Sequence, residues 1–338
     1  MSAMTRRTLL GAIATSPLWL HTAWAQPTNL KISHQFPGGS VAEGDFRDRL
    51  CRMFAAQVER RTKGKLKFSI YPRSTLMKSE AQIAAISTGQ LDMSLVPLSY
   101  AGAELPEVNI GLMPGLVTSY EQSAAWKNAA VGKELTKILA DKGVVMVSWI
   151  WQAGGMASRG KPIVEPEDAK GMKIRGGSRE MDLILKEAGA AVVTLPSNEI
   201  YAGMQTGAMD AALTSSTSLI SFRLEEVSKA LTTGRGKSYW FMLEPLMMSK
   251  AAFDRLSKEQ QGVILQVGAE MEAFALKEAK ADDEEVAKVF AKTGAKTVDL
   301  TEATVKKWQD IARRTAWKDF AAKNANTAKL LQLAEQVK

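Results

Sequence analysis

The chain has 338 residues, of which 46% are hydrophobic and 24% are charged, and its formal net charge is +8. This composition supplies enough apolar side chains for a large folded core, so it excludes a disordered chain, a collagen and a disulfide scaffold. Basic residues alternate with acidic ones along the sequence. That alternation predicts solvated helix faces and argues against a nucleic-acid partner.

The first 25 residues have the pattern of an export signal. Arg6 and Arg7 precede a short apolar run, and Ala23 and Ala25 supply the small residues of a cleavage site. The pattern fits both a general secretory signal and a twin-arginine signal, and the two alternatives stay open. We expect cleavage after Ala25, and the other apolar runs are too short to embed the chain in a membrane.

Strands and helices are predicted to alternate through the first half of the chain. Apolar residues recur with period two at 30–33 and 66–70, as in strands, whereas residues 43–61 present one apolar side, as in a helix. The same alternation continues with a helix at 79–87, a strand at 91–96, a helix at 121–142 and a strand at 144–151.

The second half repeats this alternation and then becomes helical. Residues 239–248 form a long apolar segment, which we interpret as one strand that returns to the first sheet. A helix at 258–293 could span two lobes at ~1.5 Å per residue. The other predicted elements are strands at 172–175, 191–194 and 209–213, and helices at 179–188, 196–206 and 301–337.

These elements predict an α/β protein with two lobes and a long helix that spans both. Lobe I would consist of residues 27–152 plus 240–279, and lobe II of residues 153–239 plus 280–338. Alternating strands and helices form parallel sheets, and such sheets bind ligands beyond the carboxyl ends of their strands. Two facing lobes should therefore share a ligand-binding cleft.

Residue types that bind metals or perform catalysis are scarce. Once the signal is removed, His34 is the one remaining histidine, and Cys51 is the only cysteine. They cannot form a structural zinc site, and no Gly-x-Ser-x-Gly motif accompanies His34. The acidic run 282–285 lies within a predicted helix, so its carboxylates do not converge on a metal. We predict no catalytic residue, metal or cofactor, with a secreted α/β lyase or hydrolase as the alternative.

Two segments carry the strongest family signal, KPIVEPEDAKGMKIR at 161–175 and QTGAMDAA at 205–212. Together with FPG at 36–38 and TGQLDM at 88–93, their order resembles the DctP-type solute-binding proteins of tripartite ATP-independent periplasmic (TRAP) transporters, over essentially the whole mature chain. The resemblance implies a two-lobe periplasmic receptor that closes on an anionic organic solute. It also implies delivery of that solute to small and large permease subunits in the membrane.

The resemblance assigns the ligand carboxylate to the arginine that ends the Lys-x-Arg strand, which is Arg175. The residues themselves agree, since Arg175 ends a short strand and Gly176 and Gly177 leave room for a ligand. A guanidinium donates two parallel hydrogen bonds to a carboxylate, which lysine cannot do. The alternative is a surface arginine that pairs with Glu180 or Glu199.

Gly155 and Thr214 stand where sialic-acid binders of this family carry arginine and asparagine, which argues against sialic acid. We favour a monocarboxylate, including aromatic and hydroxylated acids, and keep sugar acids and C4-dicarboxylates as alternatives. A sensor subunit that binds a similar acid is a further alternative. Besides Arg175, the expected ligand-binding residues lie at strand ends and in loops and are Trp151, Gln152, Ser178, Thr214, Ser215, Tyr239, Trp240, His34, Phe36 and Ser99.

Overall fold

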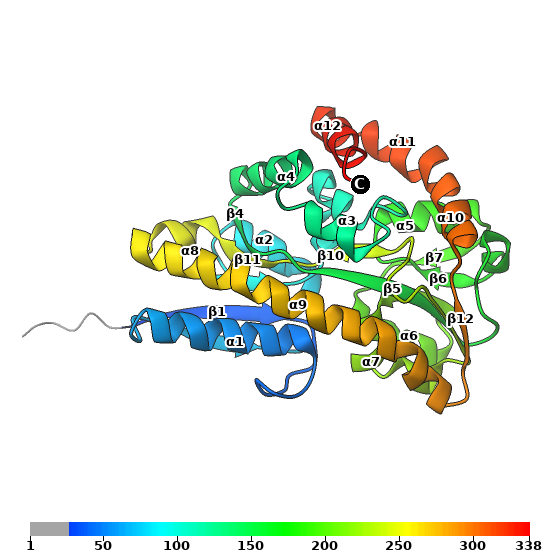
Figure 1. The fold of residues 1–338 in the computed structure, drawn as a ribbon, viewed down its shortest axis with the longest axis horizontal. Coiled ribbons are helices and arrows are strands. Elements are labelled where there is room, and N and C mark those ends of the chain that lie inside the picture. The colour runs from blue at the N-terminus through cyan, green and yellow to red at the C-terminus, as the bar shows by residue number, and fades with distance from the viewer. Residues whose placement is uncertain (1–26) are drawn as a thin grey trace, which may run out of the picture.

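The chain passes repeatedly between two α/β lobes in the computed structural model, which describes residues 27–338 (Figure 1). The export signal predicted at 1–25 lies outside these residues. Lobe I contains a five-stranded sheet with the order β2-β1-β3-β11-β4. In it, β1 is parallel to β2 and β3, whereas β11 is antiparallel to β3 and β4. Its strands are β1 (Thr28–His34), β2 (Leu66–Tyr71), β3 (Met93–Leu95), β4 (Val144–Ser148) and β11 (Leu246–Ser249).

Lobe II contains the second sheet, with the order β12-β9-β5-β8-β6-β7. β5 is antiparallel to β8 and β9, and β6 is parallel to β7 and β8. β10 pairs with the beginning of β5. The strands are β5 (Trp151–Ser158), β6 (Lys173–Arg175), β7 (Ala191–Val193), β8 (Ala211–Ser215), β9 (Ala230–Thr233), β10 (Phe241–Leu243) and β12 (Lys296–Asp299).

Helices cover both sheets. Helix α1 begins at Phe46, three residues later than predicted, because the Asp45 side chain accepts the backbone N–H of Arg47 and caps the helix. The predicted helix at 121–142 is divided into α3 and α4. The helices are α1 (Phe46–Arg61), α2 (Gln82–Ser87), α3 (Tyr120–Ala125), α4 (Ala130–Asp141), α5 (Arg179–Glu187), α6 (Ile200–Thr206), α7 (Ser216–Ser221), α8 (Lys250–Asp254), α9 (Lys258–Lys292), α10 (Glu302–Arg314), α11 (Ala316–Ala321) and α12 (Ala325–Ala334).

The chain crosses from one lobe to the other at two neighbouring connections. One passes from β4 to β5 through Trp149 and Ile150, and the other passes from β10 to β11 through Glu244 and Pro245. The backbone N–H of Glu244 donates to the Ile150 carbonyl at 2.8 Å, which joins the two crossings into a hinge. The prediction of a single strand at 239–248 is therefore wrong, because proline has no N–H for the ladder and interrupts it. The predicted return to the first sheet is confirmed for β11, which pairs with β3 and β4.

Helix α9 confirms the prediction of one long helix across the lobes, since it runs for 35 residues from Lys258 to Lys292. It packs on α1 and β4 in lobe I and on α7, β9 and β12 in lobe II, and Figure 1 shows it crossing the whole molecule. Ser257 and Gln260 form a capping box at its start. At Gly268 the helix lies so close to β4 that the Gly268 carbonyl accepts the Ser148 hydroxyl at 2.6 Å.

The chain after β12 forms three helices in place of the single helix predicted at 301–337. Thr315 separates α10 from α11, and its hydroxyl donates to the Ile311 carbonyl at 2.7 Å. Asn324 caps α12. Helices α10 and α11 pack on α5 of lobe II, whereas α12 packs on α4 of lobe I (Figure 1). The lobe boundaries given above stay a prediction.

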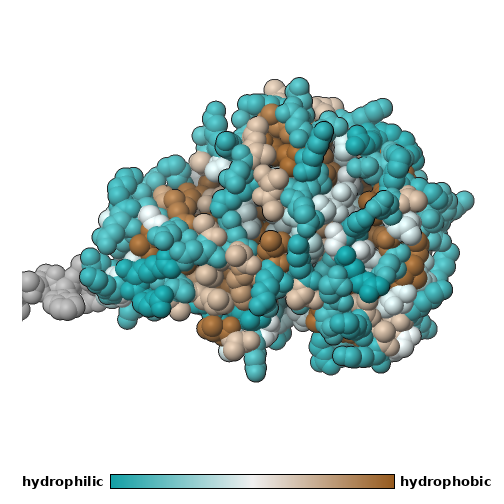
Figure 2. Space-filling model, viewed as in Figure 1, coloured by the Kyte–Doolittle hydropathy of each residue, from teal (hydrophilic) through white to brown (hydrophobic). Residues whose placement is uncertain are grey.

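The surface in Figure 2 is mostly polar, with hydrophobic side chains in separate patches. Within residues 27–338, no helix combines the length and the hydrophobicity that a membrane crossing needs.

Candidate ligand-binding site

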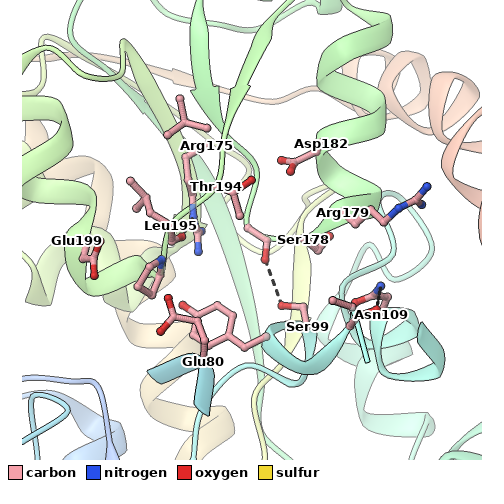
Figure 3. A pocket seen from close by; sticks show the side chains of 16 residues that line it. Glu80, Ser99, Asn109, Arg175, Ser178, Arg179, Asp182, Thr194, Leu195 and Glu199 are labelled. Carbon is pink, nitrogen blue, oxygen red and sulfur yellow. Dashed lines mark hydrogen bonds between the residues drawn. The ribbon is translucent and has the colours of Figure 1, made fainter. Parts of the chain in front are cut away.

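A cavity of about 500 Å³ lies between the lobes, where β6 and β7 of lobe II end (Figure 3). Lobe I borders it with three short 3₁₀ helices, η1 (Ser79–Ala81), η2 (Leu98–Ala101) and η3 (Pro106–Leu112). The cavity thus has the position at strand ends that the sequence predicted. The residues that line it are Glu80, Ser99, Tyr100, Gly102, Ala103, Asn109, Arg175, Gly177, Ser178, Arg179, Asp182, Val193, Thr194, Leu195, Pro196 and Glu199.

Arg175 is the central cation of this cavity. It ends β6, and only 3% of the residue is exposed. Its Nε donates to the Leu195 carbonyl at 3.1 Å, and its Nη1 donates to the Leu213 carbonyl at 2.9 Å. Figure 3 shows the side chain pointing from β6 toward the segment of lobe I that carries Glu80. Two backbone carbonyls therefore fix the direction of the guanidinium.

Arg175 forms no ion pair in the described chain, although its charge acts on the nearby Asp182 carboxyl group. Both of its hydrogen-bond acceptors are neutral carbonyls, and no carboxylate among residues 27–338 lies at ion-pair distance from it. A guanidinium removed from water costs free energy unless an anion compensates its charge. The N–H groups of Arg175 that remain free can donate in parallel to a carboxylate. The geometry therefore favours an anionic ligand.

The other charged groups at the cavity do not provide a second anion-binding site. Arg179 forms an ion pair with Asp319, outside the cavity. Burial raises the pKa of Asp182 to about 6, although Arg175 opposes the shift. The carboxylates of Glu80 and Glu199 are exposed at the cavity rim. One carboxylate is thus attracted to Arg175, whereas a second would meet acidic side chains.

The lobes contact each other around the cavity, so the structure is in a closed arrangement. The Ser99 hydroxyl donates to the Gly177 carbonyl at 3.1 Å, as the dashed line in Figure 3 shows. The backbone N–H of Ser197 donates to the Tyr100 hydroxyl at 2.8 Å. These contacts join η2 of lobe I to the loops that follow β6 and β7 of lobe II.

The structure brings part of the predicted site together. Arg175, Ser178 and Ser99 line the cavity. Trp240 lies next to it, since its indole Nε1 donates to the Gly176 carbonyl at 3.2 Å. Thr214 is buried near the end of β8, beside the Leu213 carbonyl that holds Arg175.

Other predicted residues lie away from the cavity. The Trp151 ring packs edge-on against Trp126, in a separate crevice under α9, because the chain leaves β4 before it enters β5. Tyr239 stacks on Trp308 with ring centroids 4.9 Å apart. His34 lies 3.1 Å from the Asp48 carboxylate and stacks on Phe36. Nothing in these contacts directs the Trp151, Tyr239 or His34 side chain toward Arg175.

Gln152, Ser215 and Phe36 instead surround Arg47, which the sequence analysis missed. The residue is 0% exposed, and its guanidinium lies over the Phe36 ring at 3.6 Å. Its Nη1 donates to the Glu244 carboxylate at 3.0 Å, to the Ser218 hydroxyl at 3.1 Å and to the Ser215 hydroxyl at 3.5 Å. The Gln152 amide donates to the same Glu244 carboxylate.

Two carboxylates neutralise Arg47. Its Nη2 lies 2.6 Å from Asp45, and its Nη1 lies 3.0 Å from Glu244. Burial alone would lower the pKa of Arg47, but Asp45 and Glu244 raise it above its ordinary value. Burial raises the pKa of Glu244, and Arg47 opposes that shift. Arg47 is therefore saturated, so of these two buried arginines only Arg175 lacks a carboxylate within hydrogen-bond distance among the described residues.

The signal for this cluster was present in the sequence. Glu244 interrupts the apolar run 239–248, and a carboxylate in a buried strand needs a partner. Asp45 caps α1 and Arg47 lies in its first turn, and nothing in their spacing distinguishes them from the charged residues of a solvated helix end.

Residues 38–324 match the family described as bacterial extracellular solute-binding protein, family 7. The chain belongs to this family. A solute-binding protein from Albidiferax ferrireducens is 68% identical over 336 residues, which is 98% of this chain and 99% of the relative. A TRAP periplasmic solute-binding protein from Rhodoferax ferrireducens, whose crystal structure contains malonate, is 71% identical and superposes with a TM-score of 0.90. The alignment covers 91% of this chain and 98% of that chain. A Bordetella pertussis receptor that binds pyroglutamic acid has the same fold at 23% identity, with a TM-score of 0.81 and coverage of 91% and 99%.

These relatives confirm the predicted resemblance and the two-lobe α/β fold. This family 7 protein is an extracytoplasmic solute receptor of the TRAP type, and the two solved relatives named above bind malonate and pyroglutamic acid. The relatives are receptors and not enzymes, so the alternative of a secreted lyase or hydrolase is not supported.

Proposed function

We propose that this protein works in the periplasm, captures one organic acid through a carboxylate–Arg175 pair, and delivers it to the membrane permease subunits of a TRAP transporter. The observation that carries the proposal is the buried guanidinium of Arg175, which has only neutral carbonyl partners among the described residues and lines the cavity between the lobes. Closure of the lobes removes the pair from water, where a bidentate ion pair is strongest.

The ligand class that we favour is a monocarboxylate. One guanidinium is free at the cavity, and the remaining charges near it are the carboxyl groups of Asp182, Glu80 and Glu199. These groups repel a second carboxylate and can accept hydrogen bonds from a hydroxyl or an N–H group. The malonate bound to the Rhodoferax ferrireducens relative supports a short acid and keeps dicarboxylates as the second candidate.

A panel of acids tests the proposal. Malonate, succinate, pyroglutamate, D-glucuronate and orotate are ligands of structural neighbours, and lactate and benzoate add simple monocarboxylates. We expect at least one acid to raise the melting temperature and to bind with micromolar or lower Kd, about −8 kcal/mol, in titration calorimetry. If no acid binds, the proposed function is wrong.

Delivery needs a separate experiment, since a sensor subunit would bind the same acid. Proteoliposomes that contain the small and large permease subunits of its TRAP transporter should accumulate the labelled acid only when the receptor is added. Binding without receptor-dependent accumulation would favour the sensor.

A further inference from the structure

The cluster around Arg47 contacts both lobes and the hinge at once. Asp45 and Arg47 belong to the beginning of α1 in lobe I, and Glu244 lies between the hinge strands β10 and β11. Ser215 ends β8 and Ser218 lies in α7, both in lobe II. Separation of the lobes would therefore change some of these contacts and leave others in place.

The contacts of Arg47 fall into two groups. Those with Asp45 and Glu244 stay within lobe I and the hinge, so they can persist when the lobes open. Those with the Ser218 hydroxyl at 3.1 Å and the Ser215 hydroxyl at 3.5 Å cross from lobe I to lobe II, so they require the closed arrangement. A contact that exists in one conformation only shifts the population toward that conformation.

The same strand end also holds the ligand-binding arginine. Arg175 donates to the carbonyl of Leu213, which lies two residues before Ser215 on β8. The two hydroxyls also contact each other at 3.0 Å, and Ser215 caps α7 through the N–H of Ser218. Arg47 therefore contacts the point where β8 ends and α7 begins, close to the carbonyl that fixes the direction of Arg175.

We propose that Arg47 is a positioning residue for solute capture, which grips the junction of β8 and α7 when the lobes close and thereby keeps Arg175 in its ligand-binding direction. Arg47 does not contact the solute, because its guanidinium is neutralised by Asp45 and Glu244. This inference rests on the proposed function. It adds that retention of the solute depends on a second buried guanidinium, outside the cavity.

The test uses Ser218→Ala, because this change removes the Ser218 hydroxyl. It keeps the buried charges, and the backbone N–H of residue 218 can still donate to the Ser215 hydroxyl that caps α7. The matched control is Ser216→Ala. Its hydroxyl lies on the same helix but donates to Asp283 of α9 at 2.6 Å, a contact that does not involve Arg47. Arg47→Lys is the second test variant, since it keeps the positive charge and loses the planar guanidinium group with its several N–H donors.

Stopped-flow binding of malonate, or of the tightest acid in the panel, gives the readout. Loss of a hydrogen bond to a charged group should raise koff of Ser218→Ala about tenfold while kon stays near the wild-type value. Arg47→Lys should also raise koff. Ser216→Ala should keep the wild-type koff. Small-angle X-ray scattering at saturating acid should show a smaller closed fraction for Ser218→Ala and Arg47→Lys than for the wild type and Ser216→Ala.

The outcomes separate the two proposals. If the wild type binds an acid and Ser218→Ala releases it at the wild-type rate, Arg47 has no role in capture, and the proposed function stands. An equal rise of koff in Ser216→Ala and Ser218→Ala would also overturn the inference, because it would reflect a general weakening of α7. If no acid binds the wild type, the proposed function fails, and this inference fails with it.

Discussion

Arg175 and Arg47 are both buried, but their partners give them different tasks. Arg47 meets two carboxylates and stabilises the arrangement of the chain around it. Arg175 meets two carbonyls, which direct the side chain without neutralising it. Burial of an arginine does not by itself indicate a binding site, since the charge of its partners decides whether an anion is still needed.

The first prediction concerns Arg175→Lys. The variant keeps the positive charge and loses the second parallel hydrogen bond, so we expect acid binding to weaken by about 2–3 kcal/mol in titration calorimetry. The matched control is Arg179→Lys, because Arg179 lines the same cavity but pairs with Asp319. Equal affinity of Arg175→Lys and the wild type would show that another group anchors the carboxylate.

The second prediction concerns Glu180, which is buried and accepts the Asn109 amide at 3.1 Å. Burial raises the pKa of Glu180 from 4.5 to about 7. Between these values the unfolded chain releases a proton that the folded chain keeps, so the free energy of unfolding should fall as the pH rises. The shift corresponds to about 3 kcal/mol.

Urea denaturation at pH 4.5 and pH 8 measures this effect. Burial also raises the pKa of Asp182 and of Asp282 to about 6, so the wild type should lose stability in the same direction at several sites. Glu180→Gln keeps the acceptor for Asn109 and cannot ionise, so its loss should be smaller. A variant that loses as much stability as the wild type would contradict the assignment to Glu180.

At the scale of elements, the third prediction compares two glycines of α9. A Cβ at Gly268 would overlap the Val147 carbonyl oxygen of β4, whereas a Cβ at Gly262 meets nothing within 4 Å. Gly268→Ala should therefore destabilise the protein by about 1–3 kcal/mol, despite the better helix propensity of alanine. Gly262→Ala should stabilise it by up to about 1 kcal/mol. The free energy of unfolding in urea checks both, and a stabilised Gly268→Ala would disprove the close contact.

Elements with a strong periodic pattern could be predicted from the sequence, and elements fixed by tertiary contacts could not. The prediction of a helix at 258–293 was confirmed almost to the residue, because a long helix carries many apolar positions and a capping box. β9 and β12 were not predicted, because they are only four residues each and pair with one another. Nor were the breaks at Thr315 and Asn324, where a local hydrogen bond outweighs helix propensity.

In the candidate site, too, residues in a local sequence motif could be predicted, and residues brought together by tertiary contacts could not. Arg175 was predicted because the family resemblance assigns the ligand carboxylate to the arginine that ends the Lys-x-Arg strand, and the two glycines after it agree with that assignment. The partners of Arg47 come from α1, the hinge and α7, and the spacing between them in the sequence holds no pattern. Trp151 was placed on one strand face with Trp149, and the end of β4 at Ser148 removed the basis for that argument.

At the scale of the whole molecule, the fourth prediction concerns opening. The contacts between η2 and lobe II are few and polar, so the ligand-free protein should open about the hinge formed by Ile150 and Glu244. Small-angle X-ray scattering should give a smaller radius of gyration with a saturating acid than without it. Identical scattering curves for a ligand that calorimetry shows to bind would contradict closure on the solute.

The interior position of β11 in the sheet of lobe I, between β3 and β4, has a consequence for biosynthesis. β11 separates β3 from β4, and β4 has no other neighbour in that sheet. On the ribosome, residues 28–148 emerge well before residues 246–249, so β3 and β4 wait with unpaired edges while lobe II is translated. Exposed edges invite aggregation. We therefore expect nascent chains that end before residue 246 to need protection by chaperones.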